Sequence, residues 1–354
     1  GSETDSIIFT SANVAGETRW KGIYIASASS QNSIKHAQVN YAGNSSMNFS
    51  GTDYPAGIGI EATGNIKIEN SSFENNLGYA VYADDDGGQL NTFANNHFEN
   101  NENGVAVWIN EVEDLDGTTS FMNNTNADVE IFGSTLAESI ETTWQGLSET
   151  ASYTVSGNLF IDGTVNISEG AKFELDEDVQ IYVRGAFIAE GSQTNKIEFT
   201  SSDQNQGLLW KGIYINSADG RNLLNHVMLS YAGNSDMDFS GANYSAGVGL
   251  DANGKISITN SSFSNNQGYA VYVDDDCGQL GTFTTNSFSD NMTAVGVPAD
   301  EVDALDEATT FSDNTTAEVE IFATTYATAK SSAWPNLNGN ASYTISGNVY
   351  VKGD

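Results

Sequence analysis

The sequence predicts an all-β protein folded as a parallel β-helix, a solenoid in which short strands of successive coils lie side by side. Three observations support this prediction. The chain contains one module twice, shorter segments recur inside each module roughly every 24 residues, and these segments alternate apolar and polar residues with a period of two. That period is typical of strands, whereas helical periodicity is absent over any useful length.

The two modules keep one register along the chain. The hexapeptide WKGIYI lies at Trp20–Ile25 and returns at Trp210–Ile215, and the same offset of 190 positions relates YAGNS at Tyr41 and at Tyr231. We therefore expect a monomeric fragment of a longer repetitive protein. We interpret residues 1–2 as a cloning scar, residues 3–164 as the first module, and residues 165–354 as a second module that continues the same solenoid.

A tetrapeptide, F-x-N-N, predicts how a coil is built. It begins at Phe73, Phe98 and Phe121 and, as F-x-[ND]-N, at Phe263, Phe288 and Phe311. We interpret it as a stack of phenylalanine rings beside a ladder of corner asparagines, because Asn tolerates the left-handed backbone conformation and stacked amides bond from coil to coil. With strands about 4.8 Å apart, roughly fifteen coils would form one continuous rod about 70 Å long.

Composition excludes several classes of function. The chain has 47 acidic and 12 basic residues and a net charge of −35. It is a poor nucleic-acid ligand, since phosphate binding needs clustered Lys and Arg, and no apolar run has the length for membrane insertion. The single Cys277 excludes an internal disulfide framework. Aromatic and β-branched residues are plentiful and patterned, which indicates a folded and very soluble protein.

A longer stretch resembles a known family. The segment GNLFIDGTVNISEGAKFELDEDVQIYVRGAFIAEGSQTNKIEFTS at Gly157–Ser201, followed by WKGIYI and NHVMLSYAG, is similar to bacterial secreted right-handed parallel β-helix proteins of the pectin-lyase-like superfamily, of the cell-surface and adhesin type. The resemblance covers essentially the whole chain. It implies a right-handed solenoid and an extracellular location at a bacterial cell surface. It leaves the function open, because this scaffold carries lyases, hydrolases, adhesins and passive stalks.

The resemblance also defines what an enzyme of this superfamily would need. A pectate-lyase-like site implies Arg or Lys beside acids that hold Ca²⁺, and a polygalacturonase-like site implies a Gly-His-Gly turn and an R-x-K motif. Neither of those two motifs is present, and Arg19, Arg184 and Arg221 occupy positions that the modules do not share. His36 and His226 are shared, and we interpret them as coil corners. We predict a non-enzymatic protein, with a polysaccharide lyase or glycoside hydrolase as the alternative.

Aspartate triplets are the candidates for calcium binding. Calcium takes six to eight oxygen ligands from carboxylates and carbonyls in loops, so Ca²⁺ is a candidate cofactor. No EF-hand or β-roll spacing is present. The excess of acids also suits a protein adapted to salty water, in which the charges are screened. The candidate ligands are Asp84, Asp85 and Asp86 in the first module and Asp274, Asp275 and Asp276 in the second.

Aromatic residues are the candidates for carbohydrate binding, because sugars stack on exposed rings beside polar groups. Tyr82 and Tyr272 occur in both modules beside the Asp triplets. Trp108 lies where the alternation from Val105 and Val107 points outward. For each ring, packing over a coil edge is the alternative interpretation.

The sequence therefore predicts a non-catalytic, extracellular module of a large bacterial surface protein that acts in adhesion or ligand presentation. A glycan or another cell-surface molecule is the expected partner. A stalk whose function is length remains a second interpretation, and an enzyme a third.

Overall fold

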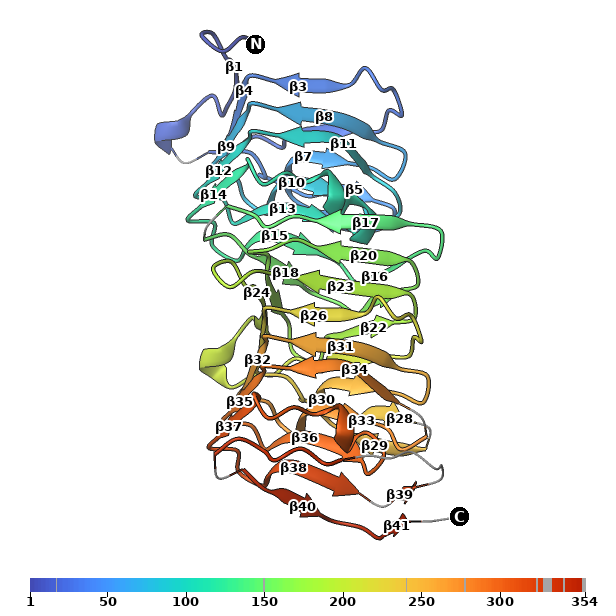
Figure 1. Ribbon diagram of the computed structural model, residues 1–354. Coiled ribbons are helices and arrows are strands. Elements are labelled where there is room, and N and C mark those ends of the chain that lie inside the picture. The colour runs from blue at the N-terminus through green and yellow to red at the C-terminus, as the bar shows by residue number, and fades with distance from the viewer. Residues whose placement is uncertain are drawn as a thin grey trace. The chain divides into compact units, whose positions relative to one another are not determined.

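The computed structural model is an all-β parallel β-helix, as the sequence predicts (Figure 1). It describes residues 1–16, 18–148, 150–239, 241–276, 278–322, 324–326, 333–339 and 341–351, so Cys277 lies outside the described residues. Strands pair in parallel with equivalent strands of the neighbouring coil. None of the helices in these ranges has the length and apolar character needed to cross a membrane.

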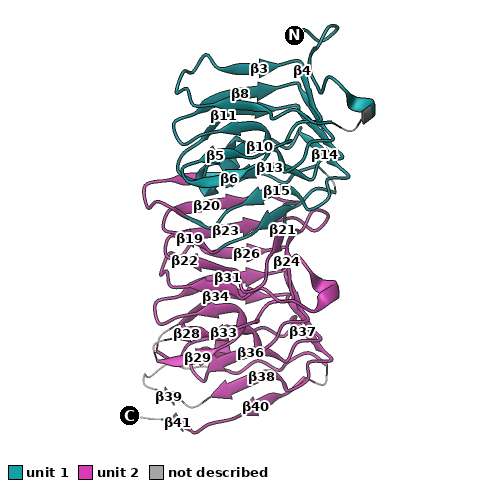
Figure 2. Ribbon diagram, turned by 180° about the vertical axis from the view of Figure 1, so that it is seen from behind, with its two compact units in different colours: residues 1–134, 142–157, 171–173 teal, residues 135–141, 158–170, 174–354 magenta. Residues whose placement is uncertain are grey.

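Contacts divide the chain into two compact units, coloured separately in Figure 2. Unit 1 contains residues 1–134, 142–157 and 171–173, and unit 2 contains residues 135–141, 158–170 and 174–354. The division of the two repeats at residues 164 and 165 stays a prediction from the sequence. Three strands include residues of both units: β16 (Ser134–Leu136), β17 (Glu141–Trp144) and β21 (Lys172–Leu175).

Parallel strands form the coils of unit 1. One set is β2 (Ile23–Ile25), β7 (Ala56–Ile60), β10 (Tyr79–Ala83), β13 (Asn103–Val107), β15 (Ala127–Ile131) and β18 (Tyr153–Val155). A second is β1 (Ile7–Phe9), β4 (Ala37–Asn40), β9 (Ser72–Glu74), β12 (His97–Glu99) and β14 (Ser120–Met122). The third is β3 (Ser33–Lys35), β8 (Asn65–Glu69) and β11 (Gln89–Ala94), and the 3₁₀ helices are η1 (Val14–Gly16) and η2 (Ile109–Asp114).

Unit 2 has the same construction. One set is β19 (Leu159–Ile161), β22 (Gln180–Val183), β25 (Gly212–Ile215), β30 (Ala246–Leu250), β33 (Tyr269–Val273), β36 (Thr293–Pro298), β38 (Ala317–Phe322) and β40 (Tyr343–Ile345). A second is β20 (Thr164–Ile167), β23 (Ala186–Glu190), β26 (Leu223–Asn225), β31 (Lys255–Thr259) and β34 (Gln279–Thr284). The third is β24 (Ile197–Ser201), β27 (Val227–Ser230), β32 (Ser262–Ser264), β35 (Ser287–Ser289) and β37 (Thr310–Ser312). The remaining elements are η3 (Gln204–Gln206), η4 (Val302–Ala304) and the pair β39 (Thr324–Tyr326) and β41 (Val349–Val351).

The predicted phenylalanine stack is confirmed in both units. Phe73, Phe98 and Phe121 pair in register on β9, β12 and β14, with ring centroids 4.6 Å and 5.2 Å apart. The centroids of the equivalent rings in unit 2 are 4.9 Å and 5.5 Å apart. Stacked inward rings of this kind bury apolar surface continuously from coil to coil.

The predicted asparagine ladder is also confirmed. Asn76 Nδ2 donates to Asn101 Oδ1 at 2.9 Å, and Asn101 Nδ2 donates to Asn124 Oδ1 at 3.0 Å. Asn75 and Asn100, which precede two of these residues, have φ angles of 56° and 55°, in the left-handed region that Asn tolerates. Asn266, Asn291 and Asn314 repeat the ladder in unit 2. Each buried amide therefore has partners in the next coil.

Each unit also contains an antiparallel hairpin that the sequence analysis did not predict. In unit 1, β5 (Met47–Phe49) pairs with β6 (Thr52–Tyr54), and in unit 2, β28 (Met237–Phe239) pairs with β29 (Ala242–Tyr244). The first hairpin packs Met47 and Phe49 against residues of β7, β10 and β13. β7 and β10 are consequently buried on both faces.

The shared histidines lie at coil corners, as predicted. His36 and His226 have φ angles of 48° and 52° and directly precede β4 and β27. The repeated hexapeptide supplies β2 in unit 1 and β25 in unit 2.

Candidate functional site

The first aspartate triplet lies in the loop between β10 and β11. Asp84 is fully buried, and its Oδ2 accepts hydrogen bonds from Ser50 Oγ at 2.9 Å and from the Ala62 amide at 3.2 Å. Asp85 and Asp86 are exposed, and one oxygen of each carboxylate lies within 4.8 Å of one oxygen of each of the others. Asp84 therefore ties the hairpin turn to the next coil, in addition to being a potential cation ligand.

Negative charge accumulates at this loop. Burial raises the pKa of the Asp85 carboxyl, and the hydrogen bond and charge of Asp84 and the charge of Asp86 raise it further. A cation placed among the three carboxylates would relieve this repulsion.

The second triplet is arranged differently. Asp274 is 2% exposed, and burial, together with the charges of Asp275 and Asp251, raises its pKa to about 6. Its Oδ2 is buried and has no hydrogen-bond partner within the described ranges. Asp275 and Asp276 are exposed. Across those same ranges, only the first triplet brings three potential metal ligands together within 4.8 Å.

Tyr82 and Tyr272 do not form the exposed sugar platform that the sequence analysis expected. Their exposed fractions are 2% and 3%, because the hairpins cover them. The Tyr82 ring centroid lies 4.5 Å from that of Phe49, and the Tyr272 centroid lies 4.8 Å from that of Phe239. A sugar ring has no access to a face that is already packed, so these two assignments are corrected.

Trp108 is half-buried and directly precedes η2. Val105 and Val107 are buried as the alternation required, and Ala106 between them is fully buried as well. The Trp108 Nε1 is a buried atom and makes no hydrogen bond to any described residue. Trp108 stays a carbohydrate candidate of the first module alone, since the second module has Pro298 at this position.

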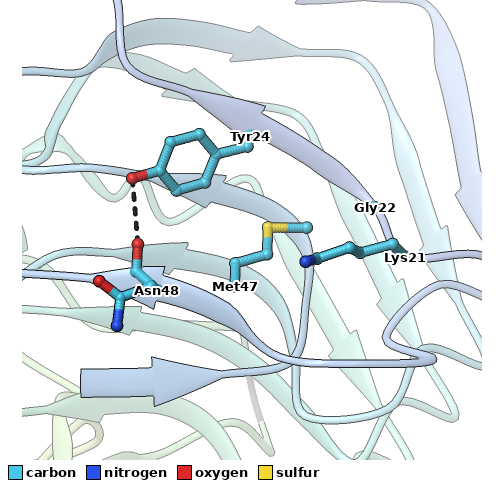
Figure 3. Close-up of a pocket in the computed structure, with 5 residues that line it drawn as sticks. All are labelled: Lys21, Gly22, Tyr24, Met47 and Asn48. Atoms are coloured by element: carbon cyan, nitrogen blue, oxygen red, sulfur yellow. Dashed lines mark hydrogen bonds between the residues drawn. The ribbon is translucent and has the colours of Figure 1, made fainter. Parts of the chain in front are cut away.

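A groove beside the first hairpin was missed by the sequence analysis. Lys21, Gly22 and Tyr24 of the hexapeptide and Met47 and Asn48 of β5 line it (Figure 3). Tyr24 is 44% exposed, and its hydroxyl donates to the Asn48 carbonyl at 3.0 Å. The groove has a volume of about 440 Å³, within the roughly 300–1,000 Å³ of small-molecule sites.

The same groove recurs beside the second hairpin, with a volume of about 360 Å³. Tyr214 Oη donates to the Asp238 carbonyl at 2.9 Å, which repeats the bond of Tyr24. The lining also includes two residues of β22, Gln180 and Tyr182, and the Gln180 Oε1 is buried with no hydrogen-bond partner in the described part of the chain. The residues that line this groove are Gln180, Tyr182, Lys211, Tyr214, Asp236, Met237, Asp238 and Asn243.

A sequence signal for the hairpin was present. MNF and MDF alternate apolar and polar residues before Ser-Gly, and an apolar Tyr ends the segment that follows it in both MNFSGTDY and MDFSGANY, which is typical of a hairpin. Ser50 and Gly51 have φ angles of 46° and 101°, as a tight hairpin turn requires. The grooves follow from the hairpins, because each lies between a hairpin and the strand of the hexapeptide.

A carboxyl pair lies elsewhere in the first module. Glu111 is buried on η2 and accepts a hydrogen bond from the Leu90 amide at 2.8 Å. Burial raises the pKa of Glu111 to about 7, and it also raises the pKa of the neighbouring Asp114. Glu301 makes the equivalent bond to Leu280 at 2.9 Å, but Ala304 replaces the second acid.

Comparisons with known proteins leave the function to be argued from these sites. No family model matches the chain, and no curated protein matches it. Among solved structures, it is similar to a fragment of TibA that was hyper-glycosylated by TibC, with 12% identity and a TM-score of 0.23. The match covers 91% of this chain and 98% of that one. At this identity and TM-score, the match says nothing about the function of this chain.

Proposed function

We propose that the chain is a non-catalytic extracellular module of a large bacterial surface protein, which acts in adhesion or ligand presentation by binding glycans in its two hairpin grooves. The observation that carries the proposal is the recurrence of one groove, with the same Lys, Tyr and Met, in both modules. An exposed lysine adds little to the stability of a coil, so packing alone does not account for its recurrence.

The lining chemistry suits a sugar. The hydrogen bond from Tyr24 to β5 holds the phenol ring in one orientation, so little side-chain entropy would be lost when a pyranose stacks on it. Lys21 and Asn48 offer donors and an acceptor at the same groove for sugar hydroxyl groups. Lining residues of this kind, one aromatic ring with a few polar groups, are typical of small-ligand sites.

A glycan-array screen tests the proposal directly. We expect the wild-type chain to bind a defined set of glycans, and Tyr24→Ala combined with Tyr214→Ala to lose most of that binding. Tyr350→Ala is the matched control, because Tyr350 is 56% exposed and lies outside both grooves. Equal binding by all three proteins would refute the grooves as the site, and no binding by the wild type would leave the stalk as the better proposal.

Calcium binding by the acidic loops is a second proposed property, favoured by the buried Asp274 carboxylate whose Oδ2 makes no hydrogen bond to the described residues. A bound cation stabilises the folded state by RT ln(1 + [L]/Kd), about 2.7 kcal/mol at a hundredfold excess over Kd. We expect a higher Tm in calcium than in chelator, and a smaller difference for Asp274→Asn. Asp5→Asn, an exposed acid far from both loops in the sequence, is the control. An identical Tm in both buffers would contradict calcium binding.

The enzymatic alternative is tested separately. The Glu111 and Asp114 pair exists in one module only, which favours a local structural role over a repeated catalytic one. We expect no cleavage of acidic or neutral polysaccharides by the chain, measured as reducing ends or unsaturated products. Cleavage that is lost in Glu111→Gln would reverse this proposal.

A further inference from the structure

We infer that the two grooves differ in charge selectivity: the first binds glycans that end in a singly charged acidic sugar, and the second binds neutral glycans. This inference rests on the proposed function, since it names the sugar class that each groove takes. It is drawn from the position of one carboxylate in each hairpin.

Each groove contains a lysine that makes no ion pair with the described residues. Lys21 and Lys211 occupy equivalent positions, and no other Lys or Arg of the 12 basic residues has a basic counterpart in the other module. Lys35, Arg184 and Arg221 by contrast form ion pairs with neighbouring acids. Lys21 and Lys211 are therefore available to a ligand.

The hairpins place their carboxylates on different strands. In the first hairpin Asn48 on β5 faces Asp53 on β6, and Asn48 Nδ2 donates to Asp53 Oδ1 at 2.9 Å. In the second hairpin the two residue types are exchanged, so that Asp238 faces Asn243. Asn48 and Asp238 line their grooves. The exchange thus brings a carboxylate into the second groove and keeps it out of the lining of the first.

A second difference acts in the same direction. Asp236 lines the second groove, and the equivalent residue of the first module is Ser46. The second groove accordingly surrounds its lysine with two carboxylates, whereas the described lining of the first groove contains Lys21 and no acid. A ligand carboxylate would contact Lys21 in the first groove, whose lining contains no acid, and would be repelled more strongly in the second, where two carboxylates line the groove beside Lys211.

The surrounding charges set the number of charges that a ligand of the first groove can carry. Burial and the nearby Glu61 and Asp84 raise the pKa of Tyr24, so the region around the lysine is itself negative. The whole chain carries a net charge of −35, which repels polyanions at distances up to a Debye length, about 8–10 Å. A glycan with one terminal negative charge can therefore contact Lys21 in these negative surroundings, whereas a chain of acidic sugars would be repelled.

The second groove offers acceptors to hydroxyl donors. Asp236 and Asp238 line this groove and contribute four carboxylate oxygens that can accept hydrogen bonds from sugar hydroxyl groups. The rings of Tyr182 and Tyr214, with centroids 5.7 Å apart, supply apolar faces. A neutral sugar presents hydroxyl groups to these acceptors without placing like charges together.

Sialyllactose and lactose are suitable probes, because they differ by one terminal acidic sugar. In a titration of Tyr214→Ala, which leaves the first groove intact, followed by saturation-transfer NMR and calorimetry, we expect sialyllactose to be preferred over lactose by about two- to fivefold in Kd. Lys21→Gln should remove this preference, and Lys211→Gln should retain it. The double variant Asn48→Asp with Asp53→Asn moves the carboxylate without changing net charge or side-chain size, and should also remove it.

The reciprocal variant, Asp238→Asn with Asn243→Asp and Asp236→Ser, should give the second groove a preference for sialyllactose. Circular dichroism and Tm establish that each variant is folded. In Tyr214→Ala, which leaves only the first groove intact, the inference is overturned and the proposed function stands if acidic and neutral members of matched array pairs bind alike, or if adding the Asn48 and Asp53 exchange leaves the preference unchanged. If no glycan binds, the proposed function itself fails.

Discussion

Phe49 is the side chain whose removal most directly tests how the first hairpin is held on its coil. The ring is 1% exposed, and its centroid lies 4.5 Å from that of Tyr82 and 5.5 Å from that of Tyr24. Substitution of a buried Phe by Ala costs about 3–5 kcal/mol, as lost transfer energy plus a residual cavity. Because the hairpin is a surface element that can move toward the sheet, we expect Phe49→Ala to cost about 3 kcal/mol.

Gly59 lies against the Phe49 ring, so a second substitution can test the same packing contact. A Cβ at Gly59 would lie 2.3 Å from Phe49 Cζ, so Gly59→Ala overpacks the contact and should cost about 1–3 kcal/mol. Once Phe49 is Ala, the obstructing ring is absent, and Gly59→Ala should cost much less. The double-mutant cycle is therefore expected to give a coupling energy of about 1–2 kcal/mol.

Urea unfolding followed by circular dichroism measures the free energy of unfolding, and hydrogen exchange of residues 47–60 reports the hairpin itself. Local exchange matters because each coil of a solenoid contacts mainly its neighbours. Gly220→Ala is the control, since a Cβ at Gly220 meets nothing within 4 Å. Equal costs of Gly59→Ala with and without the Phe49 ring would refute the packing argument. The second module provides a replicate, because a Cβ at Gly249 would lie 2.4 Å from Phe239 Cζ.

Three further predictions concern other parts of the first module. The folded-state pKa of Glu111, about 7, lies above the ordinary 4.5, so the free energy of unfolding should fall as pH rises from 4.5 to 7, and Glu111→Gln should reduce this dependence in urea titrations at several pH values, with the remainder due to groups such as Asp114 and Asp274. Asn101→Ala breaks the ladder and leaves buried groups of Asn76 and Phe73 unpaired, so Tm and urea titrations should show a loss of about 2–3 kcal/mol, which an unchanged stability would contradict. Trp108→Ala should leave glycan binding in the groove unchanged, and a loss on the array would place the site at Trp108 instead.

The coil could be predicted from the sequence because its contacts repeat. Phe73 and Phe98 are neighbours in space for the same reason that their tetrapeptides recur: each coil returns the chain to the equivalent position. A ladder residue such as Asn101 contacts its own counterparts in adjacent coils, so one local pattern specifies both partners. Periodicity therefore contained most of the information needed for the parallel sheets.

The covering of the outer face could not be deduced from the same alternation. Alternation assigns Tyr82 to the face opposite Val81, but it does not say whether another segment lies over that face. Phe49, more than thirty positions earlier in the sequence, packs against Tyr82, and Ser50 of the same hairpin bonds Asp84. The correction of the tyrosines and the burial of Asp84 thus arise from one non-local element. The residue pattern around Ser50 and Gly51 was the sequence signal that could have predicted this hairpin.

Most positions of the repeated hexapeptide WKGIYI have a structural role. Trp20 Nε1 donates to the Asn40 carbonyl at 2.8 Å, and Ile23 and Ile25 pair in register with strand β7. Gly22 has a φ angle of 122° and a position where a Cβ would lie 2.1 Å from the Ala56 carbonyl oxygen, so no other residue fits without strain.

The hydrogen bond from Tyr24 to the hairpin explains the tyrosine, so the lysine is the position of the hexapeptide that is still to be explained. The lysine forms no ion pair with the described residues, yet both modules keep it at the mouth of a groove, in a chain where acids outnumber bases by 47 to 12. Geometry explains five positions of WKGIYI. For the sixth, a ligand that carries acceptor or anionic groups is the explanation that the surrounding structure supports best.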